Sequence, residues 1–382
     1  MNQILRANQC DEKKPCTSCQ RHHVQCSLVQ TSGDAERAAQ QLHRRVGAPP
    51  STIDSSTPRS ESVTSGVDDA ATSTDDAWIT DLELLHHYTT VTYTTIPSPR
   101  HTEHVLRDDI PRLGIRFPYL MHQLLAVASL HIAYLSPETS KRYLVCASYH
   151  QSIAISGIRT TLAKPIAEGT SQALFAASAF LMVGTFATNR GLEQLETDHT
   201  YCPMDGILET FSVVRGVAAI LEASSKNLQR NLVVDLFGAQ PLRTACESLR
   251  VVEDQLSSLK AQILVDGGLE EGSKLALCSG VDLLLAFMGK KSTVMARKEL
   301  SVVFGWPWNV SEDFLQFLRA RHPAALTIFL YYCIIMHSLE ADYWFLDGWS
   351  ARLGRVIATS LRDSQWEEAA QAPLQQLKVP GM

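Results

Sequence analysis

The sequence predicts an all-α fold, in which a large helical domain follows a disordered linker and a short cysteine-rich segment. Apolar residues recur at helical spacing in long stretches that Pro and Gly separate, and no stretch shows the sustained period-two alternation of a strand. The hydrophobic fraction of 45% is enough for at least one large core, and 382 residues allow two or three domains. We predict the cysteine-rich segment over residues 1–30, the linker over 31–77, the helical domain over 78–365 and a tail over 366–382.

The cysteine-rich segment contains four of the nine cysteines, with the spacing C-x5-C-x2-C-x6-C at Cys10, Cys16, Cys19 and Cys26. The chain start lacks the apolar run of a signal peptide, so we expect a reducing compartment, where clustered thiolates are metal ligands. Four thiolates can complete one closed tetrahedral zinc site, and His22 or His23 could replace one of them. An unfolded, metal-free segment is the alternative.

Because the chain as a whole is acidic, any contact with DNA must come from a short basic segment. The net charge is −6, and basic residues only slightly outnumber acidic ones in the cysteine-rich segment. Lys13, Lys14 and Arg21 are candidate contacts to DNA phosphates, which position a protein on DNA without specifying sequence. Solvated surface charges are the alternative for these three side chains.

The linker over 31–77 is rich in Ser, Thr, Asp and Ala and has almost no large apolar residue. Such a composition cannot bury enough surface to offset the entropy of ordering, so we expect disorder. At the start of the helical domain, Thr80 and Glu83 form a T-x-x-E capping-box pattern, with Ile79 and Leu84 placed as a hydrophobic staple. This predicts a first helix that runs to about residue 94 and ends before Pro97.

The next helices follow from their apolar patterns. Residues 120–135 are apolar on nearly every face, which predicts a buried helix opened by Pro118. A third helix is predicted over 140–162. Its apolar stripe consists of Tyr143, Ala147, His150, Ala154 and Ile158.

Residues 171–188 form the most hydrophobic segment. Its uncharged core, 173–187, is shorter than the roughly 20 residues of a membrane span, so we expect a buried helix and no membrane span. Further helices are predicted over 207–223, 231–264 with a break near Pro241, 272–288, 311–319, 323–339 and 347–361.

Other chemistry-bearing residues have ordinary structural explanations. The chain lacks the zinc-protease, nucleophile-elbow, P-loop and dinucleotide-binding motifs, so we expect no enzyme.

The scattered cysteines are expected to be buried free thiols; they are Cys146, Cys202, Cys246, Cys278 and Cys333. Histidines in apolar helices are expected to be core or pocket residues; they are His86, His87, His122, His131 and His150. Eight aromatics favour core packing, with the wall of a ligand pocket as the alternative; they are Trp306, Trp308, Tyr331, Tyr332, Tyr343, Trp344, Phe345 and Trp349.

The cysteine-rich segment resembles the second half of the fungal binuclear zinc cluster, a DNA-binding module in which six cysteines hold two zinc ions. Cys10 matches the third cysteine, Cys16 and Cys19 the second C-x2-C, and Cys26 the sixth. The second cysteine of the module would stand at Gln3 and the first before Met1. The resemblance therefore implies one zinc site at most in this chain. We expect an omitted upstream exon, because the family spacing is kept from Cys10 onward; a shortened regulator is the alternative.

The helical region resembles the C-terminal regulatory domain of the fungal sterol uptake control protein class. The resemblance spans roughly Trp78 to Ile357, and it rests on Leu82–Tyr88, Pro118–Ala126, Val213–Val217, Arg321–Leu326, Tyr343-Trp344 and Gly348-Trp349. In sterol-sensing members this domain holds a sterol in a hydrophobic pocket.

Together the two resemblances imply a nuclear zinc-cluster regulator of RNA polymerase II transcription that acts on sterol or secondary-metabolite genes. Its expected partners are DNA, an apolar effector such as a sterol, and a second copy of the chain. The alternative is a regulatory protein without DNA binding that senses a ligand or pairs with another regulator.

Overall fold

The computed structural model describes residues 69–96, 103–164, 168–195, 201–224, 247–289 and 298–378. Every regular element in these ranges is helical, which confirms the predicted fold class. The chain divides into two compact units at Asp75 and Asp76, and the described helices fall almost entirely in the unit that begins at Asp76.

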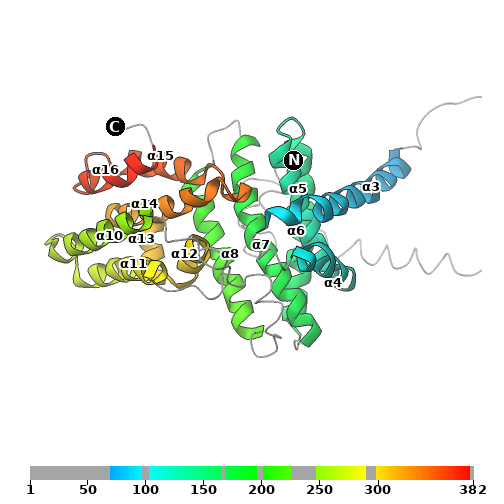
Figure 1. The fold of residues 1–382 in the computed structure, drawn as a ribbon, viewed down its shortest axis with the longest axis horizontal. Coiled ribbons are helices and arrows are strands. Elements are labelled where there is room, and N and C mark those ends of the chain that lie inside the picture. Colours follow the sequence, from blue (N-terminus) through cyan, green and yellow to red (C-terminus); the bar gives the residue numbers. More distant parts are fainter. Residues whose placement is uncertain are drawn as a thin grey trace, which may run out of the picture. The chain divides into compact units, whose positions relative to one another are not determined.

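The first helices form one packed group. The α5 helix packs closely on α6 and α7, and α4 packs on α5 (Figure 1). The elements of this group are α3 (Asp69–Thr90), η3 (Thr92–Thr95), η5 (Val105–Asp109), α4 (Ile110–Arg116), α5 (Pro118–Leu135), α6 (Ser140–Leu162) and α7 (Glu168–Leu195).

The remaining helices continue the core beyond α7. The α7 helix packs on α8, α12 packs on α8 and α14, and α14 packs on α15 and α16. The elements are α8 (Pro203–Ser224), α10 (Glu247–Val265), α11 (Glu271–Gly289), α12 (Lys298–Asn309), α13 (Glu312–Arg319), α14 (Pro323–Glu340), η7 (Trp344–Leu346), α15 (Trp349–Leu361) and α16 (Glu367–Gln376).

Most predicted helices are confirmed, several within a few residues of the expected ends. The α6 helix has the predicted bounds, and all five residues of its apolar stripe are buried. Ser311 caps α13 by accepting a hydrogen bond from the backbone N–H of Phe314. The predicted break near Pro241 lies outside the described residues.

The start of the first helix differs from the prediction. The α3 helix begins at Asp69, within the predicted linker, so Thr80 lies inside the helix and is not its N-cap. Leu84 is buried whereas Ile79 is 55% exposed, so these two residues form no staple. Residues 69–77 contain three alanines and no proline or glycine, so no helix breaker separates this stretch from the capping-box pattern.

The helical segments that were not predicted include η5 with α4, α12 and α16. Each contains a proline, which ordinarily marks a helix boundary. The α16 helix occupies most of the predicted tail and buries Ala370, Pro373 and Leu374.

The sequence of α12 shows how a helix tolerates an internal proline. Pro307 has no N–H to donate to the carbonyl of Val303, four residues earlier. The hydroxyl of Tyr332, on α14, donates to that carbonyl instead, at 2.9 Å. A long-range side-chain hydrogen bond therefore replaces the backbone bond that the proline removes.

Candidate functional site

The predicted zinc ligands and DNA contacts lie outside the described residues; they are Cys10, Cys16, Cys19, Cys26, Lys13, Lys14 and Arg21. Within the part of the chain that the structure describes, no group of three or more His, Cys, Asp and Glu side chains is arranged to hold a metal ion. The candidate zinc site therefore rests on its donor set, four thiolates, which suits tetrahedral zinc.

The first of two histidine pairs joins α3 to α5. Nε2 of His87 lies 3.3 Å from Nδ1 of His131, and Oγ1 of Thr92 lies 3.2 Å from the same nitrogen. The His131 ring also packs against Trp344, with ring centroids 4.8 Å apart. Burial, together with a smaller effect of the nearby His87, lowers the pKa of His131 to about 4. His131 is therefore neutral at physiological pH.

The second histidine pair joins α5 to α6 and reaches α3 through a carboxylate. Nδ1 of His122 lies 2.9 Å from Nδ1 of His150, and Nε2 of His150 lies 3.2 Å from a carboxylate oxygen of Asp81. Burial lowers the pKa of His150, while the charge of Asp81 opposes this shift. A neutral His150 that donates from Nε2 to Asp81 can accept from His122 at Nδ1, which satisfies both rings.

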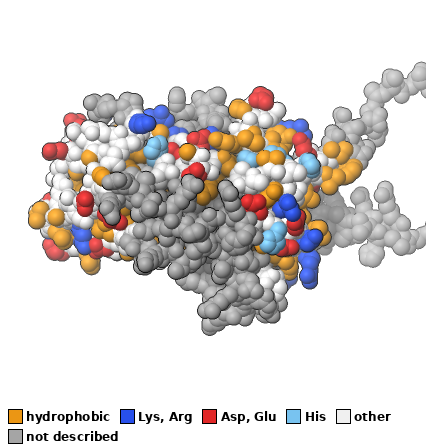
Figure 2. Space-filling model, viewed as in Figure 1, with side chains coloured by type: hydrophobic (Ala, Val, Ile, Leu, Met, Phe, Trp, Pro, Cys, Tyr) orange, Lys and Arg blue, Asp and Glu red, His pale blue; other side chains and the backbone are white. Residues whose placement is uncertain are grey.

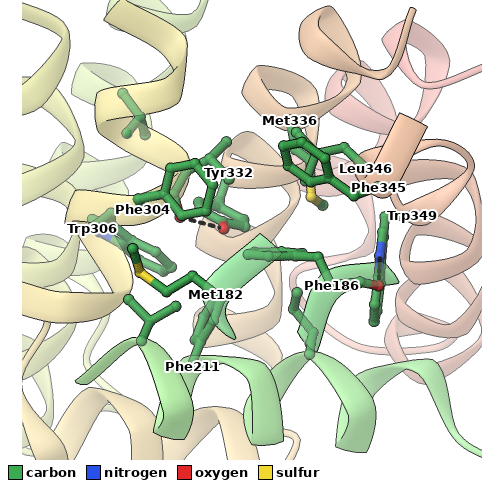
Figure 3. Packing of buried hydrophobic residues seen from close by; sticks show 14 of the residues in the cluster. Met182, Phe186, Phe211, Phe304, Trp306, Tyr332, Met336, Phe345, Leu346 and Trp349 are labelled. Atoms are coloured by element: carbon green, nitrogen blue, oxygen red, sulfur yellow. Dashed lines mark hydrogen bonds between the residues drawn. The ribbon is translucent and has the colours of Figure 1, made fainter. Parts of the chain in front are cut away.

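The predicted aromatic cluster is part of the hydrophobic core. Trp306, Phe329 and Tyr332 stack on one another, and Phe211 meets Tyr332 edge to face with centroids 5.5 Å apart. Figure 3 shows Phe211, Trp306 and Tyr332 converging in this core. Trp306 also donates to the carbonyl of Gly280, at 3.0 Å. These contacts confirm core packing as the role of Trp306 and Tyr332.

A cavity of about 290 Å³ lies between α10, α14 and α16. Its polar side chains come mainly from one face of α10, and Tyr331 and Ala369 belong to the opposite helices; the lining residues are Asp254, Gln255, Ser258, Leu259, Gln262, Tyr331 and Ala369.

One arrangement in α14 and α15 resembles a hydrolase triad by composition. His337 Nδ1 lies 2.8 Å from Oε2 of Glu340 and 3.0 Å from Oγ of Ser350. Both contacts fall on the same ring nitrogen, whereas a triad needs the hydroxyl on one nitrogen and the carboxylate on the other. The Glu340 carboxylate also accepts from the backbone N–H of Ser350, at 2.7 Å. The group therefore caps the start of α15 and provides no proton relay.

The scattered thiols agree only in part with the prediction. Cys278 and Cys333 are buried, whereas Cys146 and Cys202 are partly exposed. Burial raises the pKa of the Cys333 thiol well above its usual value, and it also raises those of Cys146 and Cys278. These three thiols are protonated at neutral pH and are poor nucleophiles. Cys246 lies outside the residues whose side chains are described.

Two helical stretches are long and apolar enough to cross a membrane, Gly169–Arg190 and Pro323–Glu340. They are 72% and 78% buried among other helices. Such burial is usual for the core helices of soluble proteins, so these stretches are weak evidence for a membrane protein. The first stretch is the predicted buried helix over 171–188, and it is longer than expected.

Comparison with curated proteins identifies the relatives of this helical chain. It is 26% identical over 341 residues to the Zn(2)-C6 fungal-type transcription factor afumD of Aspergillus fumigatus, an alignment that covers 84% of this chain and 80% of that protein. The resemblance to fungal zinc-cluster transcription factors is confirmed. No protein-family model matches the chain.

Two further relatives are named sterol uptake control protein 2. The chain is 25% identical over 281 residues to the Saccharomyces cerevisiae protein and 22% identical over 283 residues to the Candida albicans protein. Each alignment covers 70% of this chain but only 29% and 38%, respectively, of those longer relatives. The activities of the whole relatives therefore do not transfer directly to this chain.

The sequence did not predict how the histidines meet. His87 and His131 are 44 residues apart, and His122 and His150 are 28 residues apart. The sequence signal for such a contact was His150, which lies on the apolar stripe of α6. A polar ring on a buried face needs a hydrogen-bond partner. Which ring would be that partner depends on how the helices pack.

Proposed function

We propose that the chain is a fungal zinc-cluster transcription regulator, in which residues 10–26 bind zinc and DNA and the helical domain governs their activity. The observation that supports this proposal best is the similarity to a relative named as a transcription factor. The alignment covers 84% of this chain and 80% of that relative. We assign the protein to the nucleus and give it no enzymatic activity.

The zinc-binding role rests on Cys10, Cys16, Cys19 and Cys26, which can supply one tetrahedral site. Zinc held there would fold a segment that is too short to build its own hydrophobic core. Lys13, Lys14 and Arg21 would then contact DNA phosphates next to the folded site.

The effector proposed for the helical domain is an apolar small molecule such as a sterol. Two relatives named for sterol uptake control support this class, and they match this chain over 70% of its length. The regulated genes would be those of sterol or secondary metabolism.

An electrophoretic mobility shift on genomic fragments tests the DNA-binding role. The full-length chain should retard DNA fragments, and Cys16→Ser should abolish the shift because it removes a zinc ligand. Cys278→Ser is the matched control, since it replaces a buried thiol of α11 that is far along the chain from the zinc segment.

Absence of any retarded fragment would favour the alternative function: a ligand-sensing or partner-binding regulator without DNA recognition. Binding of a sterol by the same preparation, measured by titration with a radiolabelled sterol, would then assign the activity to the helical domain. Failure in both assays would contradict both versions of the proposal.

We also propose that α3 carries the contact between two copies of the chain. Trp78, Ile79 and Leu82 are 55%, 55% and 53% exposed on one side of this helix, and Figure 2 shows exposed hydrophobic side chains where α3 lies. Monomeric proteins rarely expose clustered large apolar side chains. Since α3 follows the DNA-binding segment and linker, parallel pairing would bring two DNA-binding segments to the same end of the dimer.

The oligomeric state of a charged variant tests this surface. Leu82→Glu should convert the dimer to a monomer in light scattering, because it places a carboxylate in the apolar contact. Leu275→Glu is the control, since Leu275 is 75% exposed on α11. A monomeric wild-type chain, or a dimer that survives Leu82→Glu, would contradict the proposed contact.

A further inference from the structure

The buried face of α3 contacts α5, α6 and the Leu106 backbone through groups at successive turns of the helix. Leu84 and Tyr88 are fully buried, and the Tyr88 hydroxyl donates to the carbonyl of Leu106, at 3.1 Å. The His87–His131 contact joins the same turn of α3 to α5, and the Asp81–His150 contact joins the preceding turns to α6. Both of these histidine contacts are made by imidazoles, the side chains whose unperturbed pKa lies nearest to neutral pH.

The two histidine contacts differ in the charge that faces them. Asp81 stands against His150, so a proton on that ring meets a carboxylate. The groups around His131 are His87 from α3, Thr92 from η3 and Trp344 from η7, and none of these carries a negative charge.

The charges farther from His131 do not change this contrast. On α3, Glu83 acts on His87 and not on His131, and His86 opposes it there. Arg190, which lies over the ring of Tyr134, and Asp347 pair with each other, at 3.0 Å. A proton on His131 is therefore uncompensated.

The geometry of the first pair limits the protons it can hold. Both His87 and Thr92 approach Nδ1 of His131, which can accept from either of them when the ring is neutral. A single proton on His131 reverses this contact and requires His87 to accept. A second proton leaves two cationic donors 3.3 Å apart, without an acceptor between them.

We propose that His87 and His131 form a pH-sensitive latch that holds α3 on α5 at neutral pH and releases α3 in mild acid. The released state exposes both rings to water, where each can take up a proton freely. Release also breaks the buried contacts of Leu84 and Tyr88, so we expect the whole helix to undock together. Because α3 follows the linker, this latch would couple acidity to the attachment of the N-terminal segment.

The size of the effect follows from the two states of His131. Its pKa moves from 6.5 when exposed to about 4 when docked. Protonation of this ring at pH 5 therefore shifts the docking equilibrium by about 30-fold toward release, relative to alkaline pH. At pH 7.5 the same ring shifts it hardly at all.

Hydrogen–deuterium exchange of the full-length chain at pH 7.5 and pH 5 tests the latch. After correction for the pH dependence of intrinsic exchange, protection of residues 80–90 should fall by about 30-fold at pH 5. His131→Asn should reduce this pH dependence, because an amide occupies the position of Nδ1 but takes up no proton. His86→Asn is the matched control, since it removes an exposed histidine from the same helix.

Equal protection of α3 at the two pH values in the wild-type chain would overturn the latch, as would an undiminished pH dependence in His131→Asn. If that variant fails to fold, an NMR titration of the His131 ring resonances in the wild-type chain tests the latch, because it measures the pH at which this ring is protonated. A midpoint clearly below 6.5 supports the latch, and a midpoint near 6.5 overturns it.

Discussion

Tyr332 carries a hydrogen bond that the sequence of its own helix does not reveal. Its hydroxyl donates to the Val303 carbonyl, which Pro307 leaves without a backbone donor. The Tyr332 ring meanwhile stacks on Trp306, with centroids 5.1 Å apart. The residue therefore combines packing area with a specific polar contact.

Tyr332→Phe keeps the ring and removes the hydroxyl, so it should leave the buried Val303 carbonyl unsatisfied. We expect the free energy of unfolding to fall by about 1–3 kcal/mol, measured by urea denaturation followed by circular dichroism. Tyr331→Phe is the adjacent control and should cost less than about 0.5 kcal/mol. Its hydroxyl makes no hydrogen bond among the described residues, and the residue lines a cavity. Equal losses in the two variants would contradict this role of Tyr332.

The sequence predicted which residues of α6 are buried but not which residues they touch. Helical spacing placed His150 on the apolar stripe with Tyr143 and Ala147, and all three are buried. Its contacts to His122 and Asp81 join residues far apart in the chain. Local patterns determine a face of a helix, whereas the partner on that face depends on tertiary packing.

At the level of elements, helices with continuous apolar patterns were predicted well and helices with internal prolines were not. The α5 and α14 helices open at a proline, where the ring is tolerated, and both were predicted. The α12 and α16 helices contain internal prolines and were missed. A long-range donor such as Tyr332 can compensate for a proline, and no local pattern signals it.

Two helix–helix contacts of α11 depend on glycine at the crossing. A Cβ at Gly280 of α11 would lie 2.7 Å from the ring of Phe314, and a Cβ at Gly305 of α12 would lie 2.5 Å from the ring of Phe287. Phe314 is fully buried, so its ring has no free space to move into. The close contact between α11 and α13 therefore requires a residue without a side chain at position 280.

Alanine substitutions at two helical glycines should have opposite effects. Gly280→Ala should destabilise the chain by about 1–3 kcal/mol through overpacking against Phe314. Gly216→Ala should stabilise it by up to about 1 kcal/mol, because Gly216 lies within α8 with nothing near its Cβ position. Thermal unfolding of the two variants measures the difference. Destabilisation by both substitutions would show that α8 needs its glycine for another reason.

For the whole molecule, buried neutral histidines make stability depend on pH. Burial lowers the pKa of His87, His122, His131, His150 and His322 below the ordinary value of 6.5. The unfolded chain therefore binds more protons than the folded chain below pH 6.5. The stability contributed by these groups is complete above that pH and is lost as pH falls.

We expect the free energy of unfolding at pH 5 to be at least about 2 kcal/mol lower than at pH 7.5, which is the share of His131 alone. Urea titrations at the two pH values measure it. Asp108 and Glu312 have lowered pKa values, so their stabilising charges are lost only at more acidic pH. A chain that is equally stable at both pH values would contradict the burial of these rings.

The organisation of the whole chain joins this helical domain to a four-cysteine segment. The order of cysteine-rich segment, linker and helical domain was predicted from composition and spacing. The similarity to afumD extends over 84% of the chain, so it takes in most of the helical domain. The proposal of a DNA-binding regulator therefore depends most on the chemistry of residues 10–26.

The zinc content of the intact full-length chain tests that proposal most directly. Native mass spectrometry should find one zinc ion per chain, retained in Cys278→Ser and lost in Cys16→Ser. A wild-type chain that binds no zinc would contradict the DNA-binding account and leave the helical domain as the functional part.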